Sequence, residues 1–128
     1  MPIFTHVMVG SNDKTKAKAF YDAALAPLGV KSMGTFGEAG TLIYGVDQPE
    51  FWVSSPRDGK AATHANGGTI GFIAPSRKAI DEFYAAGMAN GGTCEGEPGP
   101  RDFSPTAYAA YMRDPDGNKI CAYCMAAE

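Results

Sequence analysis

Apolar positions follow first a strand spacing and then a helical spacing, and this succession occurs twice along the chain. Residues 4–9 and 69–74 alternate apolar with small or polar side chains, which predicts two short strands. After each of them, apolar residues recur every three or four positions, which predicts one helix in each half with a buried face. The predicted buried faces are Ala17, Phe20, Tyr21, Ala24, Leu25 and Leu28 in the first helix and Ile80, Phe83, Tyr84 and Met88 in the second.

Start and stop signals flank both predicted helices. One of the polar residues 11–13 is expected to cap the first helix, and Ser76 the second. Pro27 should disturb the last turn of the first helix, since proline removes a backbone donor. Gly29 and the glycine pair at 91–92 stand where the two helices should end.

One offset relates the two halves of the sequence. Phe20 matches Phe83 and His6 matches Thr69, both at a separation of 63 residues in a chain of 128. A repeat unit of half the chain is longer than a solenoid repeat, and two copies are too few to form a solenoid. The sequence therefore predicts a pseudo-twofold domain built from one duplicated module.

Each helix is followed by three short strand-like runs, so each module reads strand, helix and three strands. The segment 114–118, Asp-Pro-Asp-Gly-Asn, has the chemistry of a hairpin turn. Gly-, Pro-, Ser- and Asp-rich residues at 95–106 predict a long loop over a cavity mouth. The expected strands are residues 30–33, 41–44, 51–54, 93–94, 108–112 and 119–124, and the expected divisions are module one at 1–55, a linker at 56–67 and module two at 68–128.

Composition excludes several classes of protein. A hydrophobic content of 45% with 20% charged residues is typical of a globular chain and not of a disordered one. Eleven basic against fourteen acidic residues, without a basic stripe, argue against a nucleic-acid partner. No run of about 18 apolar residues is present, so no membrane span is expected. Three cysteines cannot all pair within one chain, which favours reduced thiols and a cytoplasmic location.

The motifs together resemble the glyoxalase/bleomycin-resistance/extradiol-dioxygenase family, also called the vicinal oxygen chelate superfamily. The resemblance rests on the duplicated βαβββ pattern, a first strand F-T-H-V, a helix ending F-Y-x-x-x-L-x-P-L-G, and the late run Y-x-R-D-P-D-G-N-x-I. It covers nearly the whole chain and implies an α+β fold in which the two modules form a curled mixed sheet. The concave side of that sheet would be a ligand cup with the helices outside, and a homodimer is implied as well.

In metal-dependent members of this family, side chains from the first and last strands of each module hold a divalent ion in the cup. The four corresponding positions here are His6, Trp52, Thr69 and Cys121, of which only His6 is a family-type ligand. A catalytic metal needs about three strong side-chain ligands and one open position. We therefore expect no cofactor, although Zn, Ni, Mn or Fe remains an alternative.

His6 and Cys121 remain candidates for catalysis. Residues that replace ligands of one ion should lie near each other, and an imidazole beside a thiol can stabilise a nucleophilic thiolate. The alternatives are a hydrogen-bonded histidine in the cavity wall and a cysteine that fills a vacated metal site. The sequence leaves both interpretations open.

Trp52, the only tryptophan, is the main candidate for ligand binding. In the strand at 51–54 the period of two places Trp52 opposite Phe51 and Val53, which should face the helices. Trp52 would then offer the cup a flat ring for an aromatic or planar molecule. Further candidates for the cavity wall are Thr69, Tyr44, Tyr111, Tyr123, Arg101 and Phe103.

Three functions of different classes fit this sequence. The first is a small-molecule-binding protein of the bleomycin-resistance sort, with a degenerate metal site. The second is a metal-dependent lyase, isomerase or dioxygenase that acts on vicinal oxygens. The third is an interaction protein with a closed cup, which no residue specifically supports.

Overall fold

A computed structural model describes residues 2–102 and 104–126. Within these residues the chain forms two four-stranded sheets, two α-helices and one short 3-10 helix, which confirms the α+β class and the two βαβββ modules. The first module contains β1 (Val7–Gly10), α1 (Lys14–Leu25), η1 (Ala26–Leu28), β2 (Lys31–Phe36), β3 (Thr41–Gly45) and β4 (Pro49–Ser54). The second contains β5 (Ile70–Ile73), α2 (Arg77–Ala89), β6 (Thr93–Pro100), β7 (Tyr108–Arg113) and β8 (Lys119–Cys124).

The two sheets have the same topology. Their strand orders are β1-β4-β3-β2 and β5-β8-β7-β6, and in each sheet only the first strand runs parallel to its neighbour. Met8 lies opposite Trp52 in the first sheet, and Gly71 lies opposite Cys121 in the second. Since Met8 and Gly71 are 63 residues apart, the register of the strands reproduces the offset found in the sequence.

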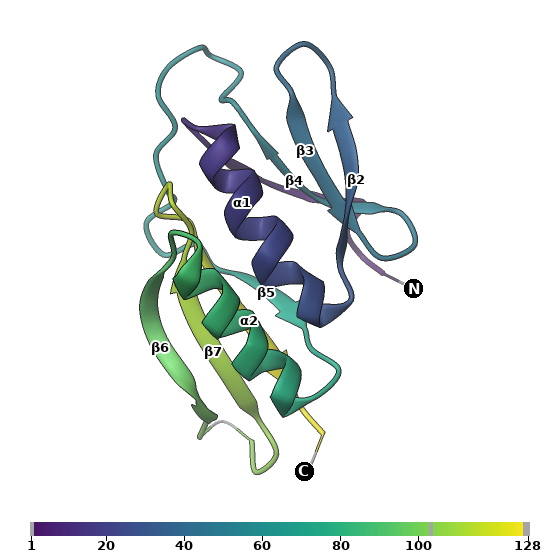
Figure 1. Cartoon of the computed structure of the whole chain (residues 1–128), viewed down its shortest axis with the longest axis vertical. Helices are drawn as coiled ribbons and strands as arrows, with labels where there is room; N and C mark the ends of the chain where they lie inside the picture. Colours follow the sequence, from purple (N-terminus) through teal and green to yellow (C-terminus); the bar gives the residue numbers. More distant parts are fainter. Residues whose placement is uncertain (1, 103, 127–128) are drawn as a thin grey trace.

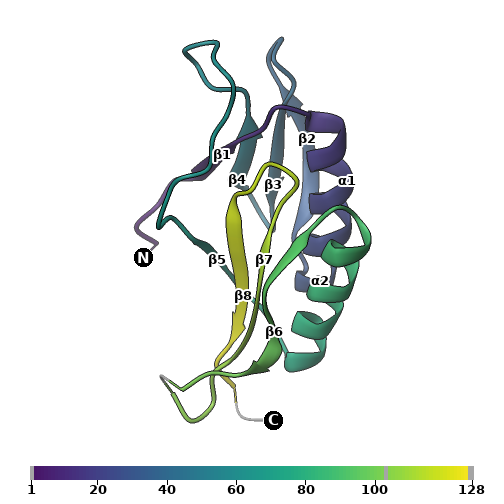
Figure 2. The ribbon, with the colours of Figure 1, turned by 90° about the vertical axis from the view of Figure 1, so that its left-hand side faces the viewer.

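Both helices lie along one side of the molecule, and both sheets lie along the other (Figures 1 and 2). α1 packs against α2 and against the first sheet, while α2 packs against the second sheet. Buried side chains of the helices and of the helix-facing strand positions form one core that spans both modules. Each sheet keeps a second face, turned away from the helices, which we call its outer face.

The predicted N-terminal caps of both helices are present, and the end of the first helix differs from the prediction. Asp13 is the residue of the 11–13 group that caps α1, because its carboxylate accepts a hydrogen bond from the Lys16 amide. Ser76 caps α2 by accepting from the Ala79 amide. Pro27 does not simply fray the helix, since it lies in the 3-10 turn η1 that continues from α1.

Several predicted strand boundaries were wrong. β1 and β5 begin at Val7 and Ile70, later than expected, and β6 extends to Pro100 through a segment predicted to be loop. β6 pairs with β7 through two register shifts, and it is the edge strand of its sheet. Bulges and an edge position accommodate glycine and proline that a central strand would exclude.

The prediction that Met88 belongs to the buried face of the second helix was also wrong. Met88 is exposed, and Gly87 is the residue that faces the core at this point. A Cβ atom at Gly87 would lie 2.4 Å from the Cε atom of Met112. The Met112 side chain therefore occupies the volume that a larger side chain at position 87 would need.

The Asp-Pro-Asp-Gly-Asn turn joins the two modules. The buried Asp114 carboxylate accepts a hydrogen bond of 2.6 Å from the Tyr21 hydroxyl of α1. The Asn118 side chain donates to the carbonyl of Gly10 in β1, and Asp116 accepts from the backbone amide of Asn12. A turn that the sequence predicted only as a hairpin connection thus fixes the position of one module against the other.

Candidate functional site

A gap separates the edge strands β1 and β5, which belong to separate sheets; we call it the seam. A cavity of about 690 Å³ lies in the seam, within the range of small-molecule sites. His6 and Thr69, both predicted site residues, line it from opposite modules, and the core residues Phe51 and Phe72 contribute apolar surface. The seam therefore offers an apolar cavity with a few polar groups at its border.

A second, smaller cavity of about 200 Å³ continues the seam along the outer faces. Met8 of the first sheet and Lys119 of the second both line it, together with Thr69 and Gly10. Thr69 lines both cavities. A ligand that fills this smaller cavity would therefore contact Met8 of the first sheet and Lys119 of the second.

The outer face of the first sheet is aromatic and apolar; we call this surface, formed by His6, Met8, Phe36 and Trp52, the first wall. The ring centroids of His6 and Trp52 are 4.9 Å apart, and those of Phe36 and Trp52 are 6.0 Å apart. Trp52 lies opposite Ile43 and points away from Phe51 and Val53, as its strand period predicted. Its indole nitrogen is buried and has no hydrogen-bond partner among the described residues, so the ring itself is what Trp52 can offer.

The outer face of the second sheet has a different chemistry; we call this surface, formed by Arg101, Tyr111, Lys119, Cys121 and Tyr123, the second wall. The hydroxyls of Tyr111 and Tyr123 form a hydrogen bond of 2.5 Å. The Arg101 Cζ atom lies 5.6 Å from the centroid of the Tyr111 ring, and the Lys119 Nζ atom lies 5.4 Å from it. Burial is the main cause that raises the pKa of the Tyr111 hydroxyl, so this phenol is neutral at pH 7.

The two candidates for catalysis have different surroundings. The His6 ring stacks near Trp52, and its Nδ1 atom lies 3.0 Å from the Thr5 hydroxyl oxygen. The Cys121 thiol is buried beside Tyr111. Burial raises the pKa of Cys121, while the Tyr111 hydroxyl and the nearby cations lower it less. A thiol with a raised pKa holds its proton at pH 7 and is a poor nucleophile.

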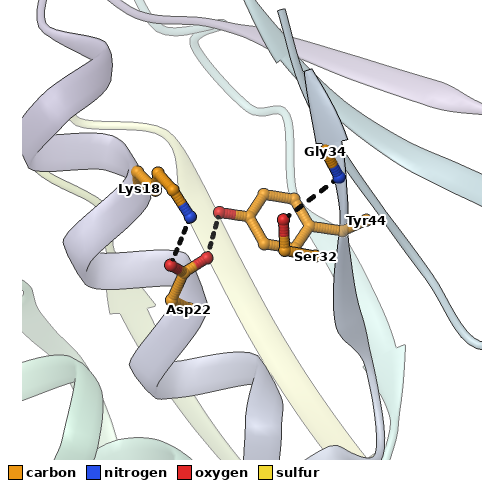
Figure 3. Close-up of polar contacts among 5 residues, drawn as sticks. All are labelled: Lys18, Asp22, Ser32, Gly34 and Tyr44. Atoms are coloured by element: carbon orange, nitrogen blue, oxygen red, sulfur yellow. Dashed lines mark hydrogen bonds and ion pairs between the residues drawn. The ribbon is translucent and has the colours of Figure 1, made fainter.

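Tyr44, a further predicted residue, does not belong to either wall. Tyr44 lies opposite Phe51 on the helix-facing side of its sheet, and its hydroxyl donates to Asp22 of α1 (Figure 3). It lines the seam cavity from the helix-facing side, whereas Trp52 has the opposite strand parity and lies on the outer face. Phe103 lies outside the described residues.

The strand register relates two of the four positions that match family metal ligands, Trp52 and Cys121. Met8 opposite Trp52 and Gly71 opposite Cys121 place Trp52 and Cys121 at equivalent points of the two sheets. An indole cannot coordinate a metal, and a protonated thiol must first lose its proton to do so. Across residues 2–102 and 104–126, no three His, Cys, Asp or Glu side chains come together in a way that could hold an ion. This donor set does not fit a divalent ion of the family type.

Sequence reasoning missed three residues that line the seam, Met8, Gly71 and Lys119, and also missed Phe36, which lies beside Trp52 on the first wall. Lys119 could have been found, since it has the same strand parity as Cys121 and Tyr123. Gly71 carries no side chain, and a Cβ atom built there would meet only the Cys121 sulfur, at 3.4 Å. No pattern in the sequence signals that this glycine opens space beside the thiol.

In the part of the chain that the structure describes, neither helix has the length and apolar character needed to cross a bilayer. A search of curated proteins returns no match. The family model described as Glyoxalase/Bleomycin resistance protein/Dioxygenase superfamily matches residues 3–122.

Solved structures of related proteins share this fold. A glyoxalase/bleomycin resistance protein from Albidiferax ferrireducens T118 is 49% identical, with a TM-score of 0.85 and coverage of 95% of this chain and 98% of that chain. A lactoylglutathione lyase from Agrobacterium tumefaciens is 18% identical, with a TM-score of 0.64 and coverage of 96% and 94%. A family enzyme from Burkholderia phytofirmans PsJN is 13% identical, with a TM-score of 0.71 and coverage of 95% and 98%. The last two similarities concern the fold alone, whereas the family model and the first relative show that the chain belongs to the glyoxalase/bleomycin resistance protein/dioxygenase superfamily.

Proposed function

We propose that this protein binds a small aromatic or planar molecule in the seam between its modules, without a catalytic metal. The observation that carries the proposal is the cavity of about 690 Å³, which His6 and Thr69 line from opposite modules. The His6 ring lies 4.9 Å from the Trp52 ring, so His6 connects this cavity to the aromatic first wall. A rigid aromatic surface beside an apolar cavity favours stacking with a flat ligand.

Intrinsic fluorescence tests this proposal directly, because Trp52 is the only tryptophan. A panel of planar aromatic compounds should contain members that quench or shift the emission in a saturable way. Calorimetry on Trp52→Ala should then show binding weakened by about 1–3 kcal/mol, because the stacking surface is lost. Trp52→Phe is the matched control and should lose less. Tight binding that leaves both the emission and the Trp52→Ala affinity unchanged would place the site elsewhere.

The proposal that no family-type metal is required rests on the donor set. Of His6, Trp52, Thr69 and Cys121, only the histidine is a strong ligand in its neutral form. Elemental analysis after incubation with Zn, Ni, Mn or Fe should give well below one ion per chain. A stoichiometric ion that is lost in His6→Ala would instead support a metal-dependent lyase, isomerase or dioxygenase.

We further propose a homodimer and a cytoplasmic location. The dimer follows the family resemblance, and exposed apolar side chains at the border of the seam, such as Phe4 and Ile73, are compatible with a covered surface. None of the three cysteines forms a disulfide, which suits a reducing compartment. Light scattering at several protein concentrations should give twice the chain mass of 13.4 kDa.

A further inference from the structure

Cations of the second wall have no acidic partner within the described residues. Among the described residues, the ion pairs are Lys18 with Asp22, Lys78 with Glu82, and Arg113 with Glu95. Neither Arg101 nor Lys119 takes part in any of these ion pairs. The chain as a whole carries a net charge of −3. Arg101 and Lys119 are therefore two cations of an acidic protein that form no ion pair with a described carboxylate.

Arg101 is held in place before any ligand arrives. Its guanidinium donates to three backbone carbonyls, those of Glu97 at 2.9 Å, Gly99 at 3.2 Å and Pro100 at 3.3 Å. Gly96 lies beneath it, since a Cβ atom there would approach the Arg101 Nη2 atom to 3.2 Å. Neutral carbonyls fix the position of the guanidinium without cancelling its charge, so binding of an anion needs little further ordering.

Lys119 brings the same positive charge to the seam. It lines the smaller cavity together with Met8 of the first wall. Lys119 and Arg101 both lie within 6 Å of the centre of the Tyr111 ring, so an anionic group at that ring is in the field of both cations. In this partly buried position the attraction is less screened by water than on an open surface.

The two walls differ in what they can bind, and the difference specifies a ligand. The first wall offers rings and the second offers two uncompensated cations, with the seam between them. We propose that the ligand is a planar aromatic carboxylate, whose ring stacks on the first wall while its carboxylate is held at the second wall by Lys119 and Arg101. This inference rests on the proposed function and adds the charge of the ligand to it.

A pair of isosteric probes separates charge from shape. Calorimetry at low salt with 2-naphthoate and with 2-naphthamide, on the full chain, should give binding of the carboxylate about tenfold tighter or more, because it adds charge-assisted contacts. Rising salt should weaken the binding of naphthoate and leave that of naphthamide unchanged.

Variants locate the effect. Lys119→Gln and Arg101→Gln should each weaken naphthoate about tenfold and leave naphthamide unchanged, because each removes one cation. Lys78→Gln is the matched control: it removes the same charge from the exposed surface of α2 and should change neither affinity. Thermal unfolding of each variant checks that the fold is retained, and Arg101→Lys keeps the charge should Arg101→Gln unfold.

The possible results separate the inference about the charge of the ligand from the proposed binding function. Equal affinity for the two probes, or an effect of Lys78→Gln as large as that of Lys119→Gln, would overturn the inference about charge while the proposed binding function stands. Binding of neutral planar compounds without binding of naphthoate would also overturn the inference about charge and leave the proposed binding function standing. Failure of every planar compound, charged or neutral, to bind in a saturable way would overturn the proposed function and this inference with it.

Discussion

The two modules have the same topology, but equivalent positions carry different chemistry. Position 8 is methionine and its counterpart 71 is glycine, while Trp52 corresponds to Cys121. The turns differ as well: the β3–β4 turn at 46–48 is exposed, whereas the β7–β8 turn contains the buried Asp114, which is hydrogen bonded to α1. The strand pairing has stayed constant while the side chains on the outer faces and in the turns have diverged.

Divergence of this kind has a physical reason. The helix-facing positions of both sheets contribute to one core, so their volumes and apolar character are constrained by close packing. The outer faces meet solvent and the seam, where a change of residue costs little stability. Substitutions at buried and at exposed positions of the two modules should therefore have unequal effects, and the measurements below test this.

The largest difference is expected between the two turns. Asp114→Ala removes the acceptor of the Tyr21 hydroxyl, of the amides of residues 116 and 118, and of the Asn118 side chain. We expect a loss of about 3 kcal/mol in the free energy of unfolding, because several buried donors lose their partner. Asp47→Ala, in the exposed turn of the first module, should change stability by less than about 0.5 kcal/mol. Urea unfolding measures both, and similar losses would show that the Asp114 turn does not join the modules.

Two tyrosines that donate to carboxylates give the next comparison. Tyr21→Phe should lower the free energy of unfolding by about 2 kcal/mol, because Asp114 is buried and loses a charge-assisted bond. Tyr44→Phe should cost under about 1 kcal/mol, since Asp22 is partly exposed and keeps Lys18 at 2.6 Å (Figure 3). Equal losses in urea unfolding would mean that burial of the carboxylate does not matter.

Alkaline pH should reveal the same buried hydroxyls. Burial, together with Asp114 for Tyr21 and Asp22 for Tyr44, raises the pKa of each phenol above its ordinary value of 10.0. Above that pH the unfolded chain loses protons that the folded chain retains, so the free energy of unfolding falls as pH rises. Each such tyrosine contributes up to about 1.4 kcal/mol per pH unit. Tyr21→Phe should make the decline shallower, and an unchanged slope would contradict this assignment.

The smallest effect on stability is expected at Gly71. A Cβ atom there meets only the Cys121 sulfur at 3.4 Å, and the backbone of Gly71 is not in the left-handed region. Gly71→Ala should therefore unfold within about 0.5 kcal/mol of the native protein. Because the added methyl enters the seam, it should weaken binding of a planar ligand several-fold, as measured by calorimetry. A variant that binds normally would show that the ligand does not reach the second wall at this point.

Much of the fold could be predicted because it depends on local patterns. The offset between His6 and Thr69, the periods of two and 3.6, and the cap at Ser76 all act over a few residues or through exact repetition. The prediction of loop and strand was wrong where strand pairing occurs in a segment rich in glycine and proline. Residues 95–100 read as loop, yet they form part of β6, since an edge strand with bulges tolerates glycine and proline.

The candidate site was predicted less completely than the fold. The strand period correctly predicted that Trp52 points away from Phe51. The same period places Tyr44 on the helix-facing side of its sheet and Lys119 on the outer face. Met88 was expected in the core because the helical period includes it, but Gly87 is the residue that faces the core there, against the Met112 side chain of β7. Whether the site residues bind a ligand stays a prediction.

The sequence by itself determined the two modules, their order of elements, the face on which Trp52 lies and the family, because each depends on spacing along one chain. Only the tertiary structure decided that the Asp114 turn joins the modules, that Lys119 and Met8 line one cavity, and that Arg101 is fixed by backbone carbonyls. These features bring together residues that lie up to about a hundred positions apart in the sequence. No local propensity encodes such distant contacts, since they arise when the packing of the core places two sheets and two helices against each other.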